Sequence, residues 1–375
     1  MPRIAIVHTL LGQLLGGGER LVEVMGDLLA KKGFEVAYVT ISPKIGRTYY
    51  ASSSPVYSIE LISTVPTILK AYVRPALAFI ETLRCVASFK PDYIILSTDH
   101  AIGFLVKRLT RRRVLIYVHW PEYLFRRKTS LLHRIYFAVV DYLEKLSIRS
   151  ADSILTNSRY TLKALSKVYP RVGGRVAYPG VDTEFFRPHN KKANTVLVVS
   201  RITPVKKIEF ALKVHAHLLK NIPDATLVVA GSLSPSDKPY LDRLISMVES
   251  LGTGDKVQFM LDVSEETLAG LYGASQIFLY PRPDEHFGMV VVEAISAGAV
   301  PVVPDSGGPS EIVRITGCGV ALPPDVEVWA ETIASLLSEP DKLSAMSKAG
   351  RGTVERLFTW ENFIDVVVSS MRWRG

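Results

Sequence analysis

The stretch "QIFLYPRPDEHFGMVVVEAISAGAVPVVP", residues 276–304, has the pattern of a strand, a loop, a helix and a second strand. The apolar run that ends at Pro281 predicts the first strand, and "RPDEHFG" predicts the loop. The helix is expected to begin near Gly288 and to end at Ala297, because Gly298 is typical of a helix C-terminus. A strand, a helix and a further apolar strand in succession indicate a parallel sheet covered by helices.

Two glutamates flank the start of this helix. Glu285 stands just before it, and Glu293 lies a turn or more inside it. The two carboxylates therefore reach different parts of one elongated ligand, with the backbone amides of Phe287, Gly288 and Met289 between them. Carboxylates accept hydroxyl hydrogens well, as on a sugar and a ribose. The alternative is that one acid caps the helix and the other is merely exposed.

The same alternation extends along the rest of the chain. Short apolar runs such as "RIAIVHT", "YIILST" and "VLIYVH" precede a Pro-, Gly- and charge-rich stretch around 178–194, after which "TVLVVS" and "TLVVAGS" resume the pattern. We predict two doubly wound α/β domains, 1–187 and 188–356, and a final helix in 357–375 whose docking partner the pattern leaves open. Two such domains facing each other would place a ligand in the cleft between them.

Two features of the first domain lie where ligands bind in such sheets, beyond the carboxyl ends of the strands. Gly16, Gly17 and Gly18 precede a helix expected to open at Glu19, and they let the backbone approach an anion closely. His119 ends the strand "VLIYVH". A plain flexible turn and a structural histidine are the respective alternatives.

In the second domain, "VVSRITPVKKIEF" places Arg201 at the end of a strand and Lys206 before a helix. A guanidinium and an ammonium at this edge are a natural clamp for a diphosphate. Surface solvation is the simpler interpretation of the neighbouring Lys207.

Size and charge set the broad class. With 375 residues, of which 48% are hydrophobic, two domains are expected, and two distant cysteines argue against a disulfide framework. Residues 1–185 hold 26 Lys and Arg against 14 Asp and Glu, or +12, whereas the remainder holds 19 against 22, or −3. The clusters at 107–113 and 126–128 could serve nucleic acid, an anionic membrane or a phosphorylated substrate, or could form a solvated face. No apolar run is long enough to span a membrane, so a cytoplasmic, soluble or peripheral protein is expected.

The ordered set "GGGER", "TNSRYT", "YPGVDTEFFRP", "SRITPVKK", "PDATLVVAGS", "EHFGMVVVE", "SGGPSEIV" and "FTWENF" resembles the retaining glycosyltransferases of family four. The resemblance covers nearly the whole chain. It implies the GT-B fold, two Rossmann-like domains facing across a cleft, with the first binding the acceptor, the second binding a nucleotide sugar, and the C-terminal helix returning to the first. One departure is Lys207, where the family commonly has glycine.

The resemblance also implies roles for the candidate residues. Arg201 and Lys206 would hold the donor diphosphate, and Glu293 the ribose. Glu285 and the backbone of residues 287–289 would grip the transferred sugar. His119 would sit beside the reacting carbon, and Gly16–Gly18 would lie near the diphosphate and the acceptor.

Within the family, "YVHWP", "EHFG" and "AGAVPVVPDSGGP" look most like cytosolic α-mannosyltransferases that extend lipid-linked oligosaccharides from GDP-mannose. We therefore expect mannose transfer to a lipid-linked or other glycan acceptor. A UDP-sugar donor, carrying glucose or N-acetylglucosamine, is the alternative. No Asp-x-Asp sequence occurs, in keeping with metal-independent, front-face transfer without a cofactor.

Further expectations concern the membrane and two rival classes. Helical residues 59–88 would suit docking to an anionic bilayer, or would form a buried core helix. A hydrolase would need Glu285 and Glu293 to face one glycosidic oxygen, which their placement across a helix start disfavours. A non-catalytic nucleotide- or nucleic-acid-binding protein would leave the glutamates and the clamp unexplained, and no nucleic-acid partner is expected.

Overall fold

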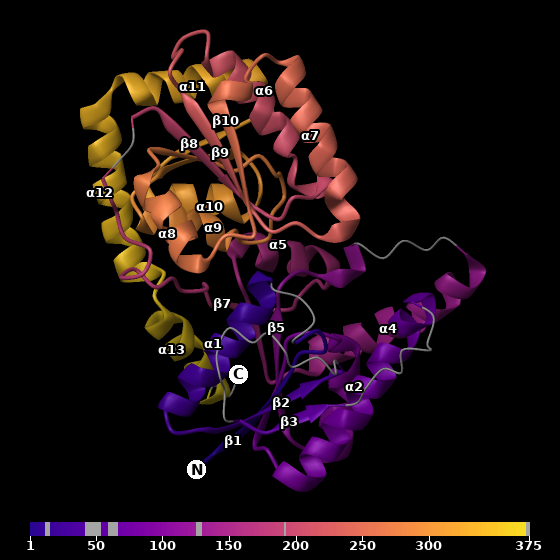
Figure 1. Ribbon diagram of the computed structural model, residues 1–375. Coiled ribbons are helices and arrows are strands. Elements are labelled where there is room, and N and C mark those ends of the chain that lie inside the picture. Colours follow the sequence, from indigo (N-terminus) through magenta and orange to yellow (C-terminus); the bar gives the residue numbers. More distant parts are fainter. Residues whose placement is uncertain (12–15, 42–53, 59–66, 125–129, 191–192, 373–375) are drawn as a thin grey trace. The chain divides into compact units, whose positions relative to one another are not determined.

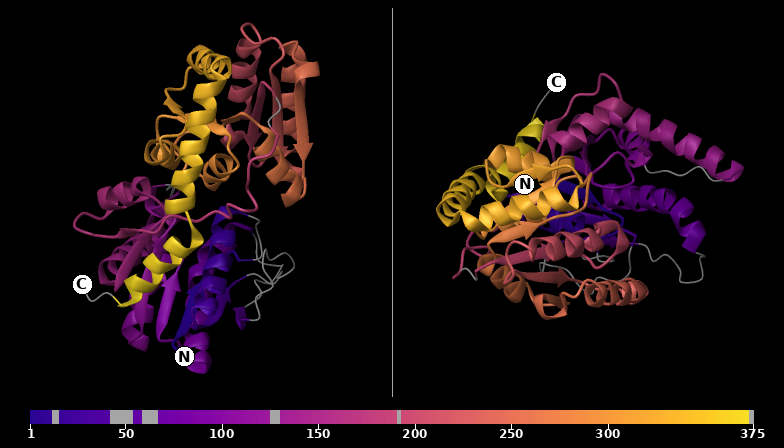
Figure 2. Two further views of the ribbon diagram at one scale, coloured as in Figure 1. Left: turned by 90° about the vertical axis from the view of Figure 1, so that its left-hand side faces the viewer. Right: turned by 90° about the horizontal axis from the view of Figure 1, so that it is seen from above.

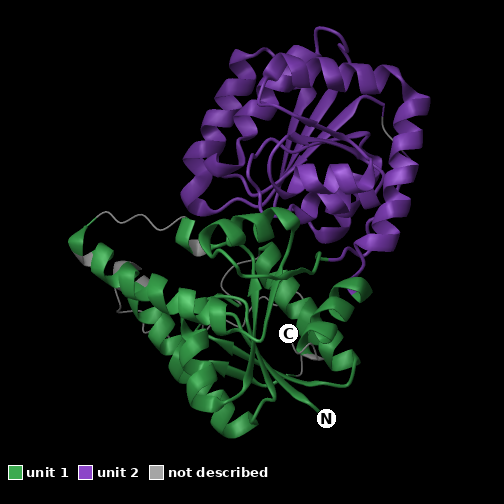
Figure 3. Cartoon of the chain, turned by 180° about the vertical axis from the view of Figure 1, so that it is seen from behind, with its two compact units in different colours: residues 1–179, 361–375 green, residues 180–360 purple. Residues whose placement is uncertain are grey.

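The computed structural model describes residues 1–11, 16–41, 54–58, 67–124, 130–190 and 193–372 (Figure 1). The chain forms two compact units. Unit 1 comprises residues 1–179 and 361–375, and unit 2 comprises residues 180–360 (Figure 3). Each unit is built around its own parallel sheet, as the alternation of strands and helices predicts.

Unit 1 contains, among its described residues, a parallel sheet of seven strands. In spatial order these are β3 (Val56–Ser58), β2 (Glu35–Thr40), β1 (Arg3–Val7), β4 (Tyr93–Leu96), β5 (Arg113–Val118), β6 (Ser153–Thr156) and β7 (Arg175–Val176). Its helices are α1 (Gly17–Lys31), α2 (Thr67–Phe89), α3 (Gly103–Thr110), α4 (Leu131–Ser150), α5 (Arg159–Val168) and α13 (Trp360–Arg372).

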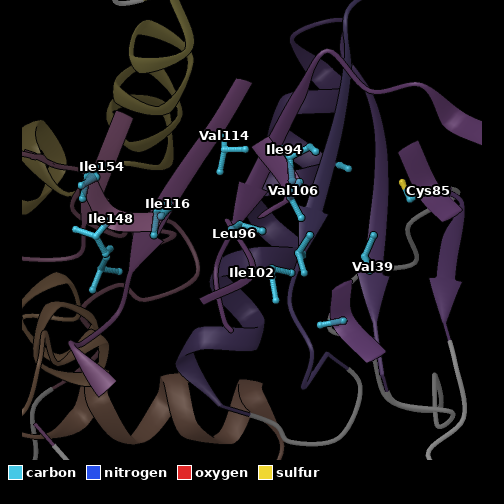
Figure 4. Packing of buried hydrophobic residues seen from close by; sticks show 14 of the residues in the cluster. Val39, Cys85, Ile94, Leu96, Ile102, Val106, Val114, Ile116, Ile148 and Ile154 are labelled. Carbon is cyan, nitrogen blue, oxygen red and sulfur yellow. The ribbon is translucent and has the colours of Figure 1, made fainter. Parts of the chain in front are cut away.

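The central strands of unit 1 are buried on both faces, as expected for a parallel sheet. On one face, alternate strand residues such as Val39, Leu96 and Ile116 pack against α2, α3 and α4, from which Cys85 and Val106 contribute (Figure 4). Full burial of each such aliphatic side chain stabilises the fold by about 1.5–3 kcal/mol. This core holds the carboxyl ends of the strands in fixed positions.

The C-terminal helix α13 belongs to unit 1 and lies beside α1 (Figure 2). Lys32 at the end of α1 binds Asp365 at 2.7 Å, and the buried Phe363 ring lies 6.0 Å from that of Tyr117. Arg175 also donates to Ser369 and Ser370. These contacts hold the last helix on the sheet of unit 1.

Unit 2 contains, in residues 180–190 and 193–360, a parallel sheet of six strands. In spatial order these are β10 (Val257–Leu261), β9 (Thr226–Gly231), β8 (Thr195–Val199), β11 (Ile277–Leu279), β12 (Val300–Pro304) and β13 (Val320–Leu322). Its helices are α6 (Ile208–Leu218), α7 (Lys238–Ser250), α8 (Glu265–Ala274), α9 (Met289–Ser296), α10 (Gly307–Thr316), α11 (Val326–Ser338) and α12 (Pro340–Leu357).

The units divide after Pro179 rather than near residue 187. Residues 180–187 belong to unit 2 because their backbone is bonded there. Val181 N–H donates to the Phe358 carbonyl at 2.9 Å, and the Phe186 carbonyl accepts from Ser296 at 2.7 Å and from Arg351 at 3.3 Å. Composition marks a linker, but only the tertiary hydrogen bonds fix its boundary.

Candidate active site

The stretch 276–304 folds as its pattern predicts. Strand β11 ends at Leu279, residues 280–288 form a loop, and α9 covers Met289–Ser296. Gly288 caps the helix with φ +99°, and Gly298 follows it with φ +80°, conformations that favour glycine. The loop therefore lies at the carboxyl edge of the sheet in unit 2, where ligands bind in this kind of fold.

Glu285 of this loop is the centre of a half-buried polar cluster. Its Oε2 atom lies 2.8 Å from Lys206 Nζ, 3.1 Å from Arg282 Nη1 and 2.6 Å from the Tyr280 hydroxyl, which donates to it. Arg201, which is exposed after β8, is close enough for its charge to act on Lys206. Lys206 and Arg282 thus contact a single carboxylate, and Arg201 lies near Lys206; these three cations are here called the cation cluster.

The charges of the cluster shift its pKa values. Burial opposes ionisation of Glu285, but the attraction of Lys206 and Arg282 outweighs it and lowers the pKa of Glu285 to about 2. Burial lowers the pKa of Lys206, which Glu285 partly restores. Burial also lowers the pKa of His286 to about 4, so this imidazole is neutral near pH 7 and adds no charge to the cluster.

Glu293 has a different environment. It is only 6% exposed on α9, and the Tyr272 hydroxyl of α8 donates to its Oε2 at 3.1 Å. The two glutamates therefore have separate partners: Glu285 contacts Lys206, Arg282 and Tyr280, whereas Glu293 accepts a hydrogen bond from Tyr272. This arrangement does not place both carboxylates on one glycosidic oxygen, as a paired-acid hydrolase would require.

The turn "SGG" at 306–308 closes against the same loop. Gly308 N–H donates to the Glu285 carbonyl at 2.7 Å, and a Cβ atom at Gly308 would overlap the backbone of Phe287. Gly307 has φ +87°. From the sequence alone, a tight turn is a sufficient explanation for these glycines. The structure adds that they pack against the backbone of residues 285–287, where a side chain would not fit.

Lys207, where the family commonly has glycine, has φ +57° as the N-cap of α6. Side chains other than glycine pay a steric cost in this left-handed region. The backbone of the loop is therefore the one that glycine would favour, and the departure leaves Lys206 in contact with Glu285.

In unit 1, the helix after the glycine loop begins at Gly17, two residues before the predicted start. Gly16 is its N-cap, and a Cβ atom there would lie 2.5 Å from Glu19 Oε2. A Cβ atom at Gly18 would lie 3.7 Å from the His119 ring. Gly18 and His119 are thus neighbours at the carboxyl edge of this sheet.

His119 is tied to the sheet on two sides. Its Nε2 lies 2.8 Å from Ser97 Oγ, and its carbonyl accepts from Asn157 at 3.0 Å and from Thr161 at 3.3 Å. The residues that follow β4 and β6 therefore position the residue that follows β5. This ring is held by specific partners rather than simply packed.

Several polar residues of this edge were missed by the sequence analysis. His8 and Thr9 follow β1, and Ser97 and Asp99 follow β4. Thr9 donates to buried Asp99 at 2.5 Å, and Arg74 of α2 binds Asp99 at 3.2 Å. In unit 2, Tyr280 and Arg282 were also missed. A usable signal exists, because each lies directly after an apolar strand, the same argument that selected His119.

The predicted basic clusters are partly structural. Lys107 binds the Ser150 carbonyl and Asp152, and Arg113 donates to the Met371 carbonyl. Residues 126–128 lie outside the described residues.

The helical stretch predicted over 59–88 is described from Thr67 onward as α2, and residues 59–66 lie outside the described residues. Its side chains Ala78, Thr82 and Cys85 are buried against the sheet. The core alternative for that stretch therefore holds for the described part of α2. No helix among the described residues is long and apolar enough to cross a bilayer.

Two family sequence profiles match the chain, Glycosyltransferase Family 4 over residues 15–185 and Glycosyl transferases group 1 over residues 182–353. An alpha-1,3/1,6-mannosyltransferase ALG2 of Rhizomucor pusillus is 26% identical over 98% of this chain and 91% of that protein. The Homo sapiens ALG2 is 28% identical over 69% of this chain and 68% of that protein. A D-inositol 3-phosphate glycosyltransferase of Mycobacterium avium is 29% identical over 61% and 56%.

Solved structures share the fold. Sucrose-phosphate synthase from Thermosynechococcus elongatus matches with a TM-score of 0.83 at 22% identity over 99% of this chain and 98% of that one. Anabaena HepE in complex with UDP-glucose matches with a TM-score of 0.74 at 16% identity over 99% of each chain. The lipopolysaccharide glycosyltransferase WaaG has a TM-score of 0.72 at 15% identity, over 97% of this chain and 98% of that one. At these identities the likeness establishes the architecture alone.

Proposed function

The chain belongs to the family 4 glycosyltransferases and has their GT-B fold, and from this premise we propose that it transfers mannose from GDP-mannose to a lipid-linked glycan acceptor. The observation that carries the proposal is the cation cluster around Glu285, at the carboxyl edge of the sheet in unit 2. Relatives named as α-1,3/1,6-mannosyltransferases, aligned over most of the chain, support mannose as the sugar.

The cation cluster suits a nucleoside diphosphate. Guanidinium groups bind phosphate oxygens with two parallel hydrogen bonds, and the half-buried Lys206 adds a point charge. Glu285 Oε2 contacts both Lys206 and Arg282. A bound diphosphate would compete for these two cations and leave the carboxylate to accept hydrogen bonds from hydroxyls of the transferred sugar.

Glu293 is proposed to bind the ribose. The Tyr272 hydroxyl donates to Oε2 of Glu293. The hydroxyl groups of a ribose would donate hydrogen bonds to the same carboxylate. The backbone of Phe287, Gly288 and Met289 lies at the N-terminus of α9, where amides without helical partners favour the negative charge of the donor.

The proposed reaction is a front-face displacement with retention. The acceptor hydroxyl oxygen forms a bond to the anomeric carbon as the bond from that carbon to the diphosphate oxygen breaks. The hydroxyl proton passes to the departing phosphate. The cation cluster stabilises the negative charge that develops on the diphosphate, which is the role of preorganised charge in such a transfer. His119, a residue of unit 1, is proposed to contact the transferred sugar. The transfer is proposed to need no metal ion or other cofactor.

A membrane-bound acceptor is supported by an unusual surface on α4. Leu131, Ile135, Val139 and Tyr142 are 72%, 59%, 56% and 62% exposed. Their spacing places them on one side of the helix. We call these four residues the α4 stripe. A row of exposed apolar side chains on a helix is what an interfacial helix presents to lipid.

The charge beside the stripe supports an anionic membrane as the occupant. Arg134, Lys145 and Arg149 of the same helix are exposed, and the first half of the chain carries a net charge of +12, from 26 Lys and Arg against 14 Asp and Glu. Basic residues beside apolar ones fit an anionic bilayer. We therefore assign the α4 stripe to an anionic membrane that carries the lipid-linked acceptor, at the cytoplasmic face.

The donor is tested by thermal unfolding with GDP, GDP-mannose, UDP and UDP-glucose. A ligand at 100 times its Kd adds about 2.7 kcal/mol, which raises the midpoint by several degrees. Stabilisation by GDP and GDP-mannose, lost in Glu293→Ala, is expected. Stabilisation by UDP compounds alone would replace GDP-mannose with a UDP-sugar as the donor. No stabilisation by any nucleotide would overturn the assignment of both glutamates.

A further inference from the structure

Three side chains form a continuous line at the carboxyl edge of the sheet in unit 1. His8 Nδ1 lies 3.1 Å from Ser97 Oγ, and Ser97 Oγ lies 2.8 Å from His119 Nε2. His8 is 3% and Ser97 1% exposed. Because the residues follow β1, β4 and β5, three neighbouring strands of the sheet fix this line, here called the His8–Ser97–His119 line.

The single hydroxyl hydrogen of Ser97 couples the two imidazoles. A serine hydroxyl donates one hydrogen bond and accepts others, so it donates to one histidine and accepts from the other. If Ser97 donates to His119 Nε2, His119 carries its proton on Nδ1, and His8 Nδ1 must donate to the serine. If Ser97 donates to His8 Nδ1, His8 carries its proton on Nε2, and His119 donates from Nε2.

Glu19 distinguishes these two arrangements. Its Oε1 lies 3.7 Å from His8 Nε2, and its side chain is 11% exposed. The distance is too long for a hydrogen bond, but in so buried a place a carboxylate favours a proton on the facing nitrogen and disfavours a lone pair there. His8 is therefore protonated on Nε2, Ser97 donates to His8, and His119 donates from Nε2 to Ser97.

The consequence falls on the other nitrogen of His119. In this arrangement Nδ1 of His119 carries a lone pair and accepts hydrogen bonds. This edge of the ring faces the glycine loop, since a Cβ atom at Gly18 would lie 3.7 Å from Cε1 and 3.9 Å from Nδ1. A hydrogen-bond acceptor there suits a sugar hydroxyl, whereas the opposite tautomer would present a donor.

We propose that Glu19, His8 and Ser97 are positioning residues that hold His119 in the tautomer protonated on Nε2, so that Nδ1 accepts a hydroxyl hydrogen of the substrate. The role of the acceptor nitrogen rests on the proposed function, but the tautomer is a property of the ligand-free protein. The two can therefore be tested separately.

The tautomer is read by nitrogen-15 NMR of the full chain labelled in histidine, in which the ring nitrogens give different two-bond correlation patterns in each tautomer. His119→Asn and His8→Asn assign the signals. The protein is expected to show His119 protonated on Nε2. Ser97→Ala and Glu19→Gln should each shift His119 toward a mixture of tautomers, while Ser97→Thr, which keeps the hydroxyl, should not.

Activity provides the second readout. Ser97→Ala is expected to lower kcat for mannose transfer roughly ten-fold or more through loss of ring alignment, with little change in the affinity for GDP, because the nucleotide binds in unit 2. Ser97→Thr should recover most of the rate. Ser88→Ala, at an exposed serine of α2, is the matched control and should change neither the NMR signals nor the rate.

Several outcomes would overturn the proposal. One is His119 protonated on Nδ1 in the unsubstituted protein. Another is a tautomer that neither Ser97→Ala nor Glu19→Gln alters. If Ser97→Ala does not fold, Glu19→Gln and Ser97→Thr still decide between the two arrangements. The expected tautomer in a protein that binds no GDP-mannose would uphold this inference and contradict only the proposed donor.

Discussion

Glu285 holds two cations and a tyrosine at one oxygen atom, so its ionisation is linked to folding. Its folded pKa of about 2 lies below the ordinary 4.5. The resulting stability, roughly 3 kcal/mol, is fully present above the ordinary pKa and is lost as pH falls from about 4.5 to about 2.

We predict that Glu285→Gln lowers the free energy of unfolding near pH 7, because Lys206 and Arg282 lose their partner. The difference in the free energy of unfolding between the unsubstituted protein and this variant should be about 2 kcal/mol smaller at pH 3 than near pH 7. Urea unfolding at both pH values measures it. Glu249→Gln, at an exposed position of α7, is the control. A gap that stays constant with pH would contradict the low pKa.

Lys207 is the second residue with a measurable consequence. Its φ of +57° lies in the left-handed region, which costs a non-glycine residue about 1–2 kcal/mol of stability. Glycine avoids this cost but loses more backbone entropy on folding, which offsets part of the gain. Lys207→Gly is therefore expected to raise stability by up to about 1 kcal/mol. Lys213→Gly, at an exposed interior position of α6, should instead lower it by about 1 kcal/mol. Equal losses in the two variants would show that the backbone at 207 carries no strain.

At this scale the sequence predicts residues that stand next to a recognisable strand-to-helix corner. Glu285, Glu293 and His119 were selected as candidates in this way. Ser97 and His8 were missed although they too follow apolar strands, and only the structure shows the contact that joins these two positions, 89 residues apart. Arg282 likewise becomes a candidate only when the loop folds back to bring it to Glu285.

Among the elements, α2 and α4 of unit 1 run side by side, joined by the Tyr136 hydroxyl, which donates to the Tyr72 carbonyl at 3.1 Å (Figure 1). Both helices are amphipathic in sequence. Which one covers the sheet and which one exposes an apolar row depends on their tertiary packing. The sequence therefore left residues 59–88 open as either a membrane surface or a core helix, whereas the structure buries one side of α2 and exposes the apolar α4 stripe.

The α4 stripe makes a direct prediction for vesicle binding. Replacing Leu131, Ile135 and Val139 together by glutamine should lower partition onto vesicles of phosphatidylglycerol and phosphatidylcholine roughly ten-fold or more, since buried apolar area drives such binding. Co-sedimentation measures the partition.

The control triple is Ile245→Gln, Val328→Gln and Leu357→Gln, at apolar positions of unit 2 that are 41%, 37% and 47% exposed. Equal losses in both triples would contradict the assignment of this surface, as would binding that does not depend on the anionic lipid.

At the scale of the whole molecule, the fold was predictable because both sheets are parallel and their strands are nearly continuous apolar runs. The boundary between the two domains was harder to predict. Residues 180–187 look like a linker in composition, and only the hydrogen bonds of Val181 and Phe186 place them in unit 2.

Charge distribution across the molecule leads to a prediction about metal ions. Arg201, Lys206 and Arg282 are proposed to supply the positive charge that a divalent cation would otherwise provide to the departing diphosphate. Excess EDTA is expected to leave the transfer rate unchanged. Loss of activity in EDTA and its return with Mg²⁺ or Mn²⁺ would show that the cation cluster is insufficient.

The central claim is transfer of mannose with retention, and the most direct measurement follows radiolabelled mannose from GDP-mannose into a lipid-linked glycan acceptor. Label is expected in the lipid fraction, released by an α-mannosidase, and strongly reduced by Lys206→Met and Glu293→Ala in folded protein. Label that enters the lipid only from a UDP-sugar, or a product that resists α-mannosidase, would contradict the account.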